Sequence, residues 1–249
     1  SKKSDDDVID GEVFDADGNM RISKTFMEFL QNGNDPRLPI LAARRSDGST
    51  TAADLFGMPN GLTGGALEAK YGTESSYYAE PNRAVLGGFD APMVFQTYAE
   101  VEFLKAEAAQ RGWHTGSVET HYNNGVKAAM QMLSSLYPNA AAISDAQVSD
   151  YLAANPLNTS SPMEMIHTQY WAATFLNEYE AFANWRRTGF PTLQPFGGEA
   201  VYPGNETNGE IPRRMIYPNS EESTNPENYA AAVSRQGPNT LTTRVWWDK

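Results

Sequence analysis

The stretch Tyr98-Ala99-Glu100-Val101-Glu102-Phe103-Leu104-Lys105-Ala106-Glu107-Ala108 decides how this chain is interpreted. Its apolar residues recur every three to four positions, which is the period of an amphipathic helix. We therefore predict a helix from about residue 94 to residue 110 that ends at Gly112. Its buried face is predicted to consist of Val94, Tyr98, Val101, Leu104 and Ala108.

Three further helices are predicted downstream, over about 117–136, 144–154 and 161–187. The last is apolar on more than one side, which is typical of a helix packed between neighbours. Four helices joined by short loops form two antiparallel hairpins of the length found in tetratricopeptide arrays. The predicted fold class is mainly α, with tetratricopeptide-like helical hairpins and long irregular loops.

Two of these helices begin with the pattern of a capping box, in which two side chains satisfy the first backbone N–H groups of the helix. Ser144 is followed three residues later by Gln147, and Ser161 is followed by Glu164. Pro162 stands in the first turn, where proline is favoured. We expect both serines to act as N-caps through their side chains.

The regions on either side of the helices have a different texture. Residues 1–92 are rich in Gly, Asp, Asn and Pro, with one predicted helix at 23–30 and a short β-hairpin whose turn lies at residues 15–19. Residues 189–249 contain many prolines and aromatics, and we predict an irregular segment that wraps over the helices. The arginine pairs 186–187 and 213–214 are expected to hold this segment to the last helix by pairing with Glu178, Glu180 or Glu210.

Composition excludes several kinds of chemistry. The chain has 31 acidic and 19 basic residues and a net charge of -12, which argues against a nucleic-acid partner. It has no cysteine, so it has no disulfide, thiol nucleophile or Cys-ligated zinc. Asp15, Asp17 and Asn19 have the spacing that opens a calcium loop, but the twelfth position is Phe26 instead of glutamate. A turn is the favoured interpretation, and we expect no cofactor and no metal.

No apolar run is long enough to span a bilayer, and the first residues are too polar for a signal peptide. No catalytic motif of a serine hydrolase, zinc peptidase or phosphate-binding loop occurs. A pair of carboxylates for glycoside cleavage is set by folding rather than by spacing, so the sequence leaves a hydrolase open as an alternative. We expect the chain not to be an enzyme.

Several strings in order along the chain resemble the SusD/RagB family, in particular its SusD-like branch. They are Arg21-Ile22-Ser23-Lys24-Thr25, Asn34-Asp35-Pro36-Arg37-Leu38-Pro39, the stretch 98–108 quoted above, Tyr179-Glu180-Ala181-Phe182-Ala183-Asn184-Trp185-Arg186-Arg187-Thr188-Gly189, Ile211-Pro212-Arg213-Arg214-Met215-Ile216-Tyr217-Pro218 and Leu241-Thr242-Thr243-Arg244-Val245-Trp246-Trp247-Asp248-Lys249.

The resemblance implies that residues 1–249 form the C-terminal part of one SusD-like domain, with a loop-rich region at 1–92, helices at 93–188 and a wrapping segment at 189–249. It implies an outer-membrane, cell-surface lipoprotein of Bacteroidota that binds a nutrient, with an N-terminal half of the same protein carrying the lipid anchor. Its partners would be a SusC-like TonB-dependent transporter and an oligosaccharide, or alternatively a peptide.

The glycine- and tyrosine-rich stretch 46–92 is the predicted place for a ligand, because sugars stack their C–H faces on aromatic rings and direct their hydroxyls to polar groups. The alternative is that these rings anchor the loop to the helices, and that Trp113 caps a core. The candidate ligand-binding residues are Tyr71, Tyr77, Tyr78, Asn82, Arg83, Phe89 and Trp113.

Overall fold

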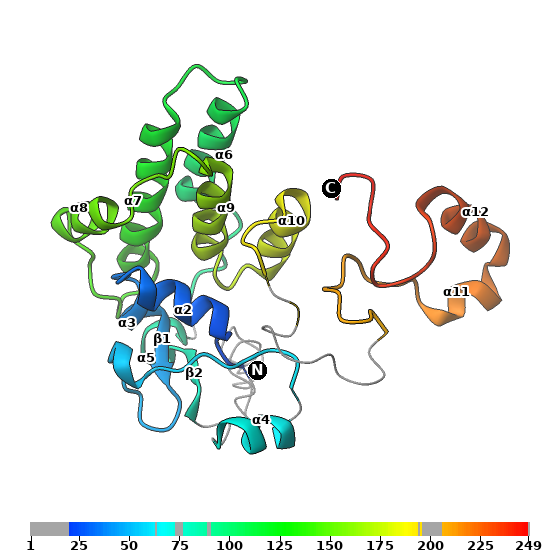
Figure 1. The fold of residues 1–249 in the computed structure, drawn as a ribbon, viewed down its shortest axis with the longest axis horizontal. Coiled ribbons are helices and arrows are strands. Elements are labelled where there is room, and N and C mark those ends of the chain that lie inside the picture. Colours follow the sequence, from blue (N-terminus) through cyan, green and yellow to red (C-terminus); the bar gives the residue numbers. More distant parts are fainter. Residues whose placement is uncertain are drawn as a thin grey trace, which may run out of the picture.

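The computed structural model describes residues 20–62, 64–72, 77–88, 91–193, 195 and 206–248. The fold is mainly α-helical, as the sequence predicts (Figure 1). No helix within these ranges combines the length and the apolar character needed to cross a membrane. Phe89 and the predicted β-turn at 15–19, with its calcium-like spacing, lie outside the described residues.

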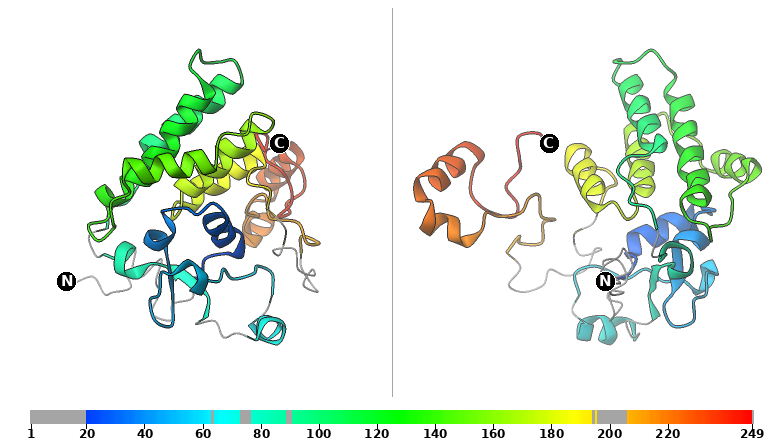
Figure 2. Two further views of the ribbon diagram at one scale, coloured as in Figure 1. Left: turned by 60° about the vertical axis from the view of Figure 1, so that its left-hand side comes forward. Right: turned by 180° about the vertical axis from the view of Figure 1, so that it is seen from behind.

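The central part of the fold is a helical body. It consists of α6 (Tyr98–Gln110), α7 (Val118–Leu136), α8 (Asp145–Ala154), α9 (Pro162–Ala173) and α10 (Glu178–Thr188). Helices α6 and α7 form an antiparallel hairpin, and α9 packs against both (Figures 1 and 2). Helix α8 contacts α7, and α10 contacts α9. The predicted ends of α6, α7 and α8 are confirmed to within a few residues at each end.

A layer of short elements lies below one end of this body in Figure 1. It contains α2 (Lys24–Asn32), α3 (Leu38–Leu41), β1 (Ala42–Arg44), the 3-10 helix η2 (Ala52–Asp54), α4 (Gly64–Tyr71), β2 (Ala79–Pro81) and α5 (Arg83–Leu86). Ser23 caps α2 as predicted, because its hydroxyl accepts a hydrogen bond from the Phe26 N–H. Strands β1 and β2 pair antiparallel with Ala43 opposite Glu80, so a short sheet forms from segments for which the sequence predicts no strand.

The hydrophobic core joins the layer to the body. Phe103, Tyr122 and Ile166 are completely buried where α6, α7 and α9 meet, and the same cluster includes residues of α2 and α3. Gly125 allows α6 and α7 to approach closely, since a Cβ atom there would lie 2.6 Å from the Phe103 ring. The core therefore depends on one bulky side chain facing one residue without a side chain.

The buried face of α6 differs from the prediction. Val94 precedes the helix, while Tyr98 and Leu104 are exposed. Three glutamates face inward instead, together with Phe103 and two alanines; they are Glu100, Glu102 and Glu107. The apolar period predicted the wrong buried face because each of these carboxylates has a hydrogen-bonding or charged partner from another turn or helix. Such a partner offsets the free-energy cost of burying the charge.

The predicted fourth helix is two helices. The chain breaks between α9 and α10, where Leu176 adopts a left-handed backbone with φ 69. Asn177 then caps α10 by accepting a hydrogen bond from the Glu180 N–H. Ser161 begins α9 but makes no side-chain capping bond, so the prediction of a second capping box is wrong.

The C-terminal segment is more regular than expected. It forms α11 (Asn219–Thr224) and α12 (Pro226–Gln236), which lie to the side of α10 in Figure 1 instead of covering α6, α7 and α9. The arginines do hold the segment to α10, with partners other than those predicted. Arg186 donates to the Arg213 carbonyl oxygen at 3.0 Å, and the Arg213 guanidinium lies 4.1 Å above the Trp185 ring.

Candidate functional site

A groove of about 420 Å³ opens between α2 and the two loop segments that follow η2 and precede β2. Lys24, Glu28 and Gln31 come from α2, and Phe56, Tyr77 and Tyr78 come from the loops. We call it the aromatic groove. The remaining lining residues are small or apolar: Ala52, Ala53, Leu55, Gly57 and Pro59.

Two exposed rings give the aromatic groove its character. Phe56 and Tyr77 stack with centroids 4.8 Å apart and planes 23° apart. They are 43% and 36% exposed, so the pair presents a flat apolar surface to solvent. Tyr78 is only 3% exposed and meets Tyr77 edge to face at 6.3 Å. The buried ring therefore anchors the exposed pair in a favourable aromatic geometry.

Backbone hydrogen bonds fix the position of these rings. The Ala79 N–H donates to the Phe56 carbonyl oxygen at 2.8 Å, which ties the segment before β2 to the segment after η2. The Lys24 N–H donates to the Met58 carbonyl oxygen at 2.9 Å. Between them, a Cβ atom on Gly57 would lie 2.4 Å from the Lys24 Cα, so only glycine permits this approach. These backbone contacts hold the stacked rings of Phe56 and Tyr77 in place without a ligand.

Polar groups of α2 line the other side of the groove. The Gln31 amide donates to the carbonyl oxygens of Ala52 and Leu55, both at 2.8 Å, and so holds η2 against α2. Lys24 and Glu28 form an exposed ion pair at 3.2 Å. Such a pair contributes little to stability because it is solvated. Both groups are therefore available to hydrogen-bond a ligand resting on the rings.

The structure places the predicted site residues in different locations. Tyr77 and Tyr78 line the groove. The Asn82 amide is buried and donates to the Pro39 carbonyl oxygen at 2.9 Å, while Arg83 bonds to Glu80 at 3.2 Å. These two contacts join β2 and α5 to their neighbours. Tyr71 ends α4, and its side chain lies outside the described part of the structure.

Trp113 is separate from the groove, at the turn between α6 and α7. Its side chain is 76% exposed, so it does not cap a core as the alternative interpretation expected. The Arg111 guanidinium lies 5.2 Å from its ring centroid. Figure 1 shows this turn at the opposite end of the hairpin from β2.

Sequence reasoning missed the contributions of Phe56 and α2. Phe56 lies within the stretch 46–92 and could have been included with the tyrosines, because it is an aromatic residue next to a glycine. Lys24 and Glu28 carried no comparable indication. They reach the groove because α2 packs beside a segment about thirty residues further along the chain, a contact that only the fold reveals.

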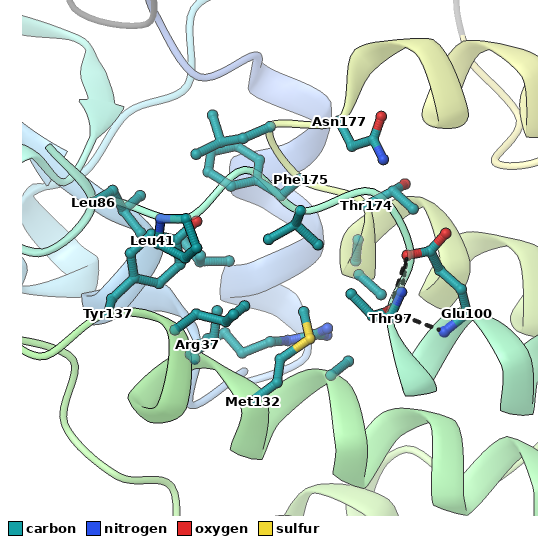
Figure 3. Close-up of a pocket in the computed structure, with 18 of the residues that line it drawn as sticks. Arg37, Leu41, Leu86, Thr97, Glu100, Met132, Tyr137, Thr174, Phe175 and Asn177 are labelled. Atoms are coloured by element: carbon teal, nitrogen blue, oxygen red, sulfur yellow. Dashed lines mark hydrogen bonds between the residues drawn. The ribbon is translucent and has the colours of Figure 1, made fainter. Parts of the chain in front are cut away.

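A second cavity, of about 280 Å³, lies between the layer and the helical body. Figure 3 shows that Leu41, Leu86 and Phe175 line one side. Glu100 and Thr97 bond to each other in the capping box of α6, with the Thr97 N–H donating to Glu100 Oε1 at 2.8 Å. Because these polar groups are already paired, the cavity offers mainly apolar contact.

Two outer residues of this cavity are unusually exposed for their type. Met93 is 65% exposed and Tyr179 is 90% exposed. Burial raises the pKa of Glu100 at the cavity wall, against the opposing hydrogen bonds from Thr97. An apolar cavity with exposed large side chains at its mouth is typical of a surface that another piece of protein covers.

Among the described residues, no group of three or more His, Asp or Glu side chains is arranged to hold a metal ion. Of the described residues that line the aromatic groove, Glu28 is the one carboxylate, and it is paired with Lys24. A retaining or inverting glycosidase uses two carboxyl groups across the scissile bond.

This chain is mainly helical and carries a groove lined by the stacked rings of Phe56 and Tyr77. The family model described as "Starch-binding associating with outer membrane" matches residues 8–218. The chain belongs to this SusD-like family. The resemblance noted in the sequence is confirmed.

Solved structures agree with this assignment. One titled "chitin-binding protein" is 32% identical with a TM-score of 0.77, over 92% of this chain and 50% of its own. A "Bacteroidetes AC2a SusD-like" structure is 25% identical with a TM-score of 0.75, over 97% of this chain and 56% of its own. A chitin-binding SusD homolog from Flavobacterium johnsoniae, at 24% identity and a TM-score of 0.69, shares the fold. The chain thus spans about half the length of these structures, and no curated protein matches it.

Proposed function

We propose that this chain is part of a cell-surface nutrient-binding protein that takes an oligosaccharide in the aromatic groove and works with a TonB-dependent outer-membrane transporter. The observation that carries the proposal is the stacked, solvent-exposed pair of Phe56 and Tyr77 beside the polar groups of α2. The role is binding without catalysis.

The geometry favours a saccharide over a peptide. A pyranose ring presents a flat C–H face that matches the flat surface of the stacked pair, while its equatorial hydroxyls can reach Lys24 and Glu28. A peptide bound in extended form would use main-chain partners along an open strand edge. Both described strands are only three residues long and no such edge lines the groove. The chitin-binding title of the relative at 32% identity supports a saccharide.

Calorimetric titration of the protein with chito-oligosaccharides, malto-oligosaccharides and short peptides tests this proposal. We expect binding by an oligosaccharide and a loss of affinity of about 3- to 10-fold in Phe56→Ala and in Tyr77→Ala, from the loss of ring contacts. Tyr77→Phe keeps the ring and should retain most of the affinity. Phe95→Ala is the matched control, since Phe95 is 86% exposed and does not line the groove.

Two results would contradict the proposal. One is saccharide affinity unchanged in the double variant Phe56→Ala, Tyr77→Ala while the protein stays folded. The other is peptide binding that the double variant weakens, without any saccharide binding. Co-purification of a TonB-dependent transporter with the cell-surface protein tests the partnership separately.

We also propose that the apolar cavity of Figure 3 is covered by an N-terminal half of the same protein. Those structures are about twice the length of this chain, and Met93 and Tyr179 at the mouth of the cavity are exposed large side chains. Tyr179→Asp should weaken the association of the two halves expressed as separate polypeptides, and Trp246→Asp, at an exposed residue outside the cavity, should not. Equal association of both variants would exclude this surface.

A further inference from the structure

The turn between α6 and α7 brings two histidines together that are seven residues apart in sequence. The Nε2 atoms of His114 and His121 are 3.1 Å apart, and their ring centroids are 5.1 Å apart. His114 is exposed and the His121 side chain is 15% exposed, so the pair is accessible from solvent. Neither residue takes part in the aromatic groove.

A carboxylate fixes the orientation of the His121 imidazole. His121 Nδ1 lies 2.7 Å from Glu102 Oε2, so its N–H donates to the carboxylate, and Nε2, which faces His114, is the ring nitrogen left to bind an ion. Metal-bound histidines are commonly held in this way, with the second ring nitrogen donating to a carboxylate.

Glycine at position 116 makes room for the two ring nitrogens. A Cβ atom there would lie 2.3 Å from His121 Nε2 and 2.8 Å from His114 Nε2. Any larger residue would push the imidazoles apart. The pair therefore depends on a glycine in the turn as well as on the carboxylate behind it.

We propose that His114 and His121 form a two-histidine site for a divalent transition-metal ion such as Zn²⁺. With nitrogens about 2.05 Å from the ion, the 3.1 Å separation corresponds to an angle of about 100° at the metal, between octahedral and tetrahedral values. The same geometry sets the ring centroids about 4.8 Å apart, so the rings need to approach by only about 0.3 Å. The other coordination positions are open to water or to a side chain of a partner.

The alternative is a plain hydrogen bond from His114 to His121. Substitution separates the two, because His114→Gln keeps a hydrogen-bonding amide beside His121 but supplies no imidazole nitrogen. We expect tag-free protein to bind one Zn²⁺ per chain by calorimetry, with affinity lowered at least about tenfold in His114→Gln and in His121→Gln. Zn²⁺ should also raise the melting temperature of the parent protein and not of these variants.

Two controls accompany the titration. Trp113→Ala changes an exposed neighbour in the same turn and should bind Zn²⁺ like the parent. Ca²⁺ should not bind, because it prefers oxygen ligands. Circular dichroism checks that each variant is folded. The proposal is overturned if the parent shows no Zn²⁺ binding, or if His114→Gln binds Zn²⁺ as well as the parent does. Neither result bears on the aromatic groove.

Discussion

Phe103 and Phe56 are the same residue type in two regions of the molecule, with opposite surroundings. Phe103 in the helical body is 0% exposed and packs beside Tyr122 and Tyr170. Phe56 in the layer is 43% exposed and stacks on Tyr77. In the first region aromatic area is removed from water and stabilises the fold; in the second it is left in water by a rigid backbone. An exposed ring held in this way serves binding better than stability.

Charged residues show the same contrast. In the layer, Lys24 and Glu28 form a solvated pair at the groove. In the body, Glu107 is 4% exposed and accepts two hydrogen bonds from Arg187, at 2.6 and 2.7 Å. That fork ties α6 to α10, and the geometry is the bidentate one in which arginine binds carboxylates most strongly. Substitutions in the two regions should therefore affect different measurements.

The largest difference is expected between Phe103→Ala and Phe56→Ala. Removing the Phe103 ring leaves a cavity between α6, α7 and α9 and should lower the free energy of unfolding by about 3–5 kcal/mol. Phe56→Ala should lower it by less than about 1 kcal/mol, because much of the ring is already in water. Urea denaturation of both variants measures this. Equal destabilisation would mean that the groove is part of the core.

Glu107 should make the stability of the helical body depend on pH. Burial raises its pKa, but the neighbouring His167, whose Nε2 lies 3.3 Å from Glu107 Oε2, and the hydrogen bonds from Arg187 outweigh burial and bring the pKa well below its ordinary value of 4.5. As the pH falls, the Glu107 carboxylate therefore takes up its proton at a higher pH in the unfolded chain than in the folded protein. The stabilisation is fully present above about pH 4.5 and is lost as the pH falls further.

The expected loss is of the order of 2 kcal/mol, the contribution of hydrogen bonds to a charged group. Chemical denaturation of the parent and of Glu107→Gln between about pH 6 and pH 3 tests this, and the variant should show the flatter profile. Glu222→Gln on α11 is the control, since Glu222 is exposed. Parallel profiles for Glu107→Gln and the parent would contradict the assigned role of the Glu107–Arg187 pair.

The sequence predicted the features that depend on residues close together in the chain, such as the position of a helix and its N-cap. The apolar period located α7, and Ser23 marked the start of α2. The burial of Glu102 and Glu107 on α6 was not predictable, because these carboxylates have partners on other helices: Glu107 meets Arg187 eighty residues away. The break after α9 was missed because Phe175 and Leu176 continue the apolar character of the helix through the turn.

The candidate site was predicted in part for the same reason. Aromatics in a glycine-rich stretch indicated Tyr77 and Tyr78, which line the groove. Asn82 was selected by its position in that stretch, yet its amide donates to the Pro39 carbonyl oxygen in α3 instead. A residue's neighbours along the chain do not show whether its polar group is already paired. Whether the polar group is paired depends on which distant segment of the chain packs against it in the fold.

The two serines at the starts of α8 and α9 give the smallest expected difference. The Ser144 hydroxyl accepts a hydrogen bond from the Gln147 N–H. In return, the Ser144 N–H donates to Gln147 Oε1 at 3.0 Å. Ser161 starts α9 without a side-chain cap, although its sequence pattern is equivalent. Ser144→Ala should therefore cost about 1 kcal/mol of unfolding free energy. Ser161→Ala should change it by no more than a few tenths, because a serine that does not cap loses no hydrogen bond on substitution. Thermal and urea unfolding of the two variants side by side provide the measurement. An equal cost at both positions would show that Ser161 caps α9 in solution, and the sequence pattern would then be a better guide at that helix than the geometry of its first turn.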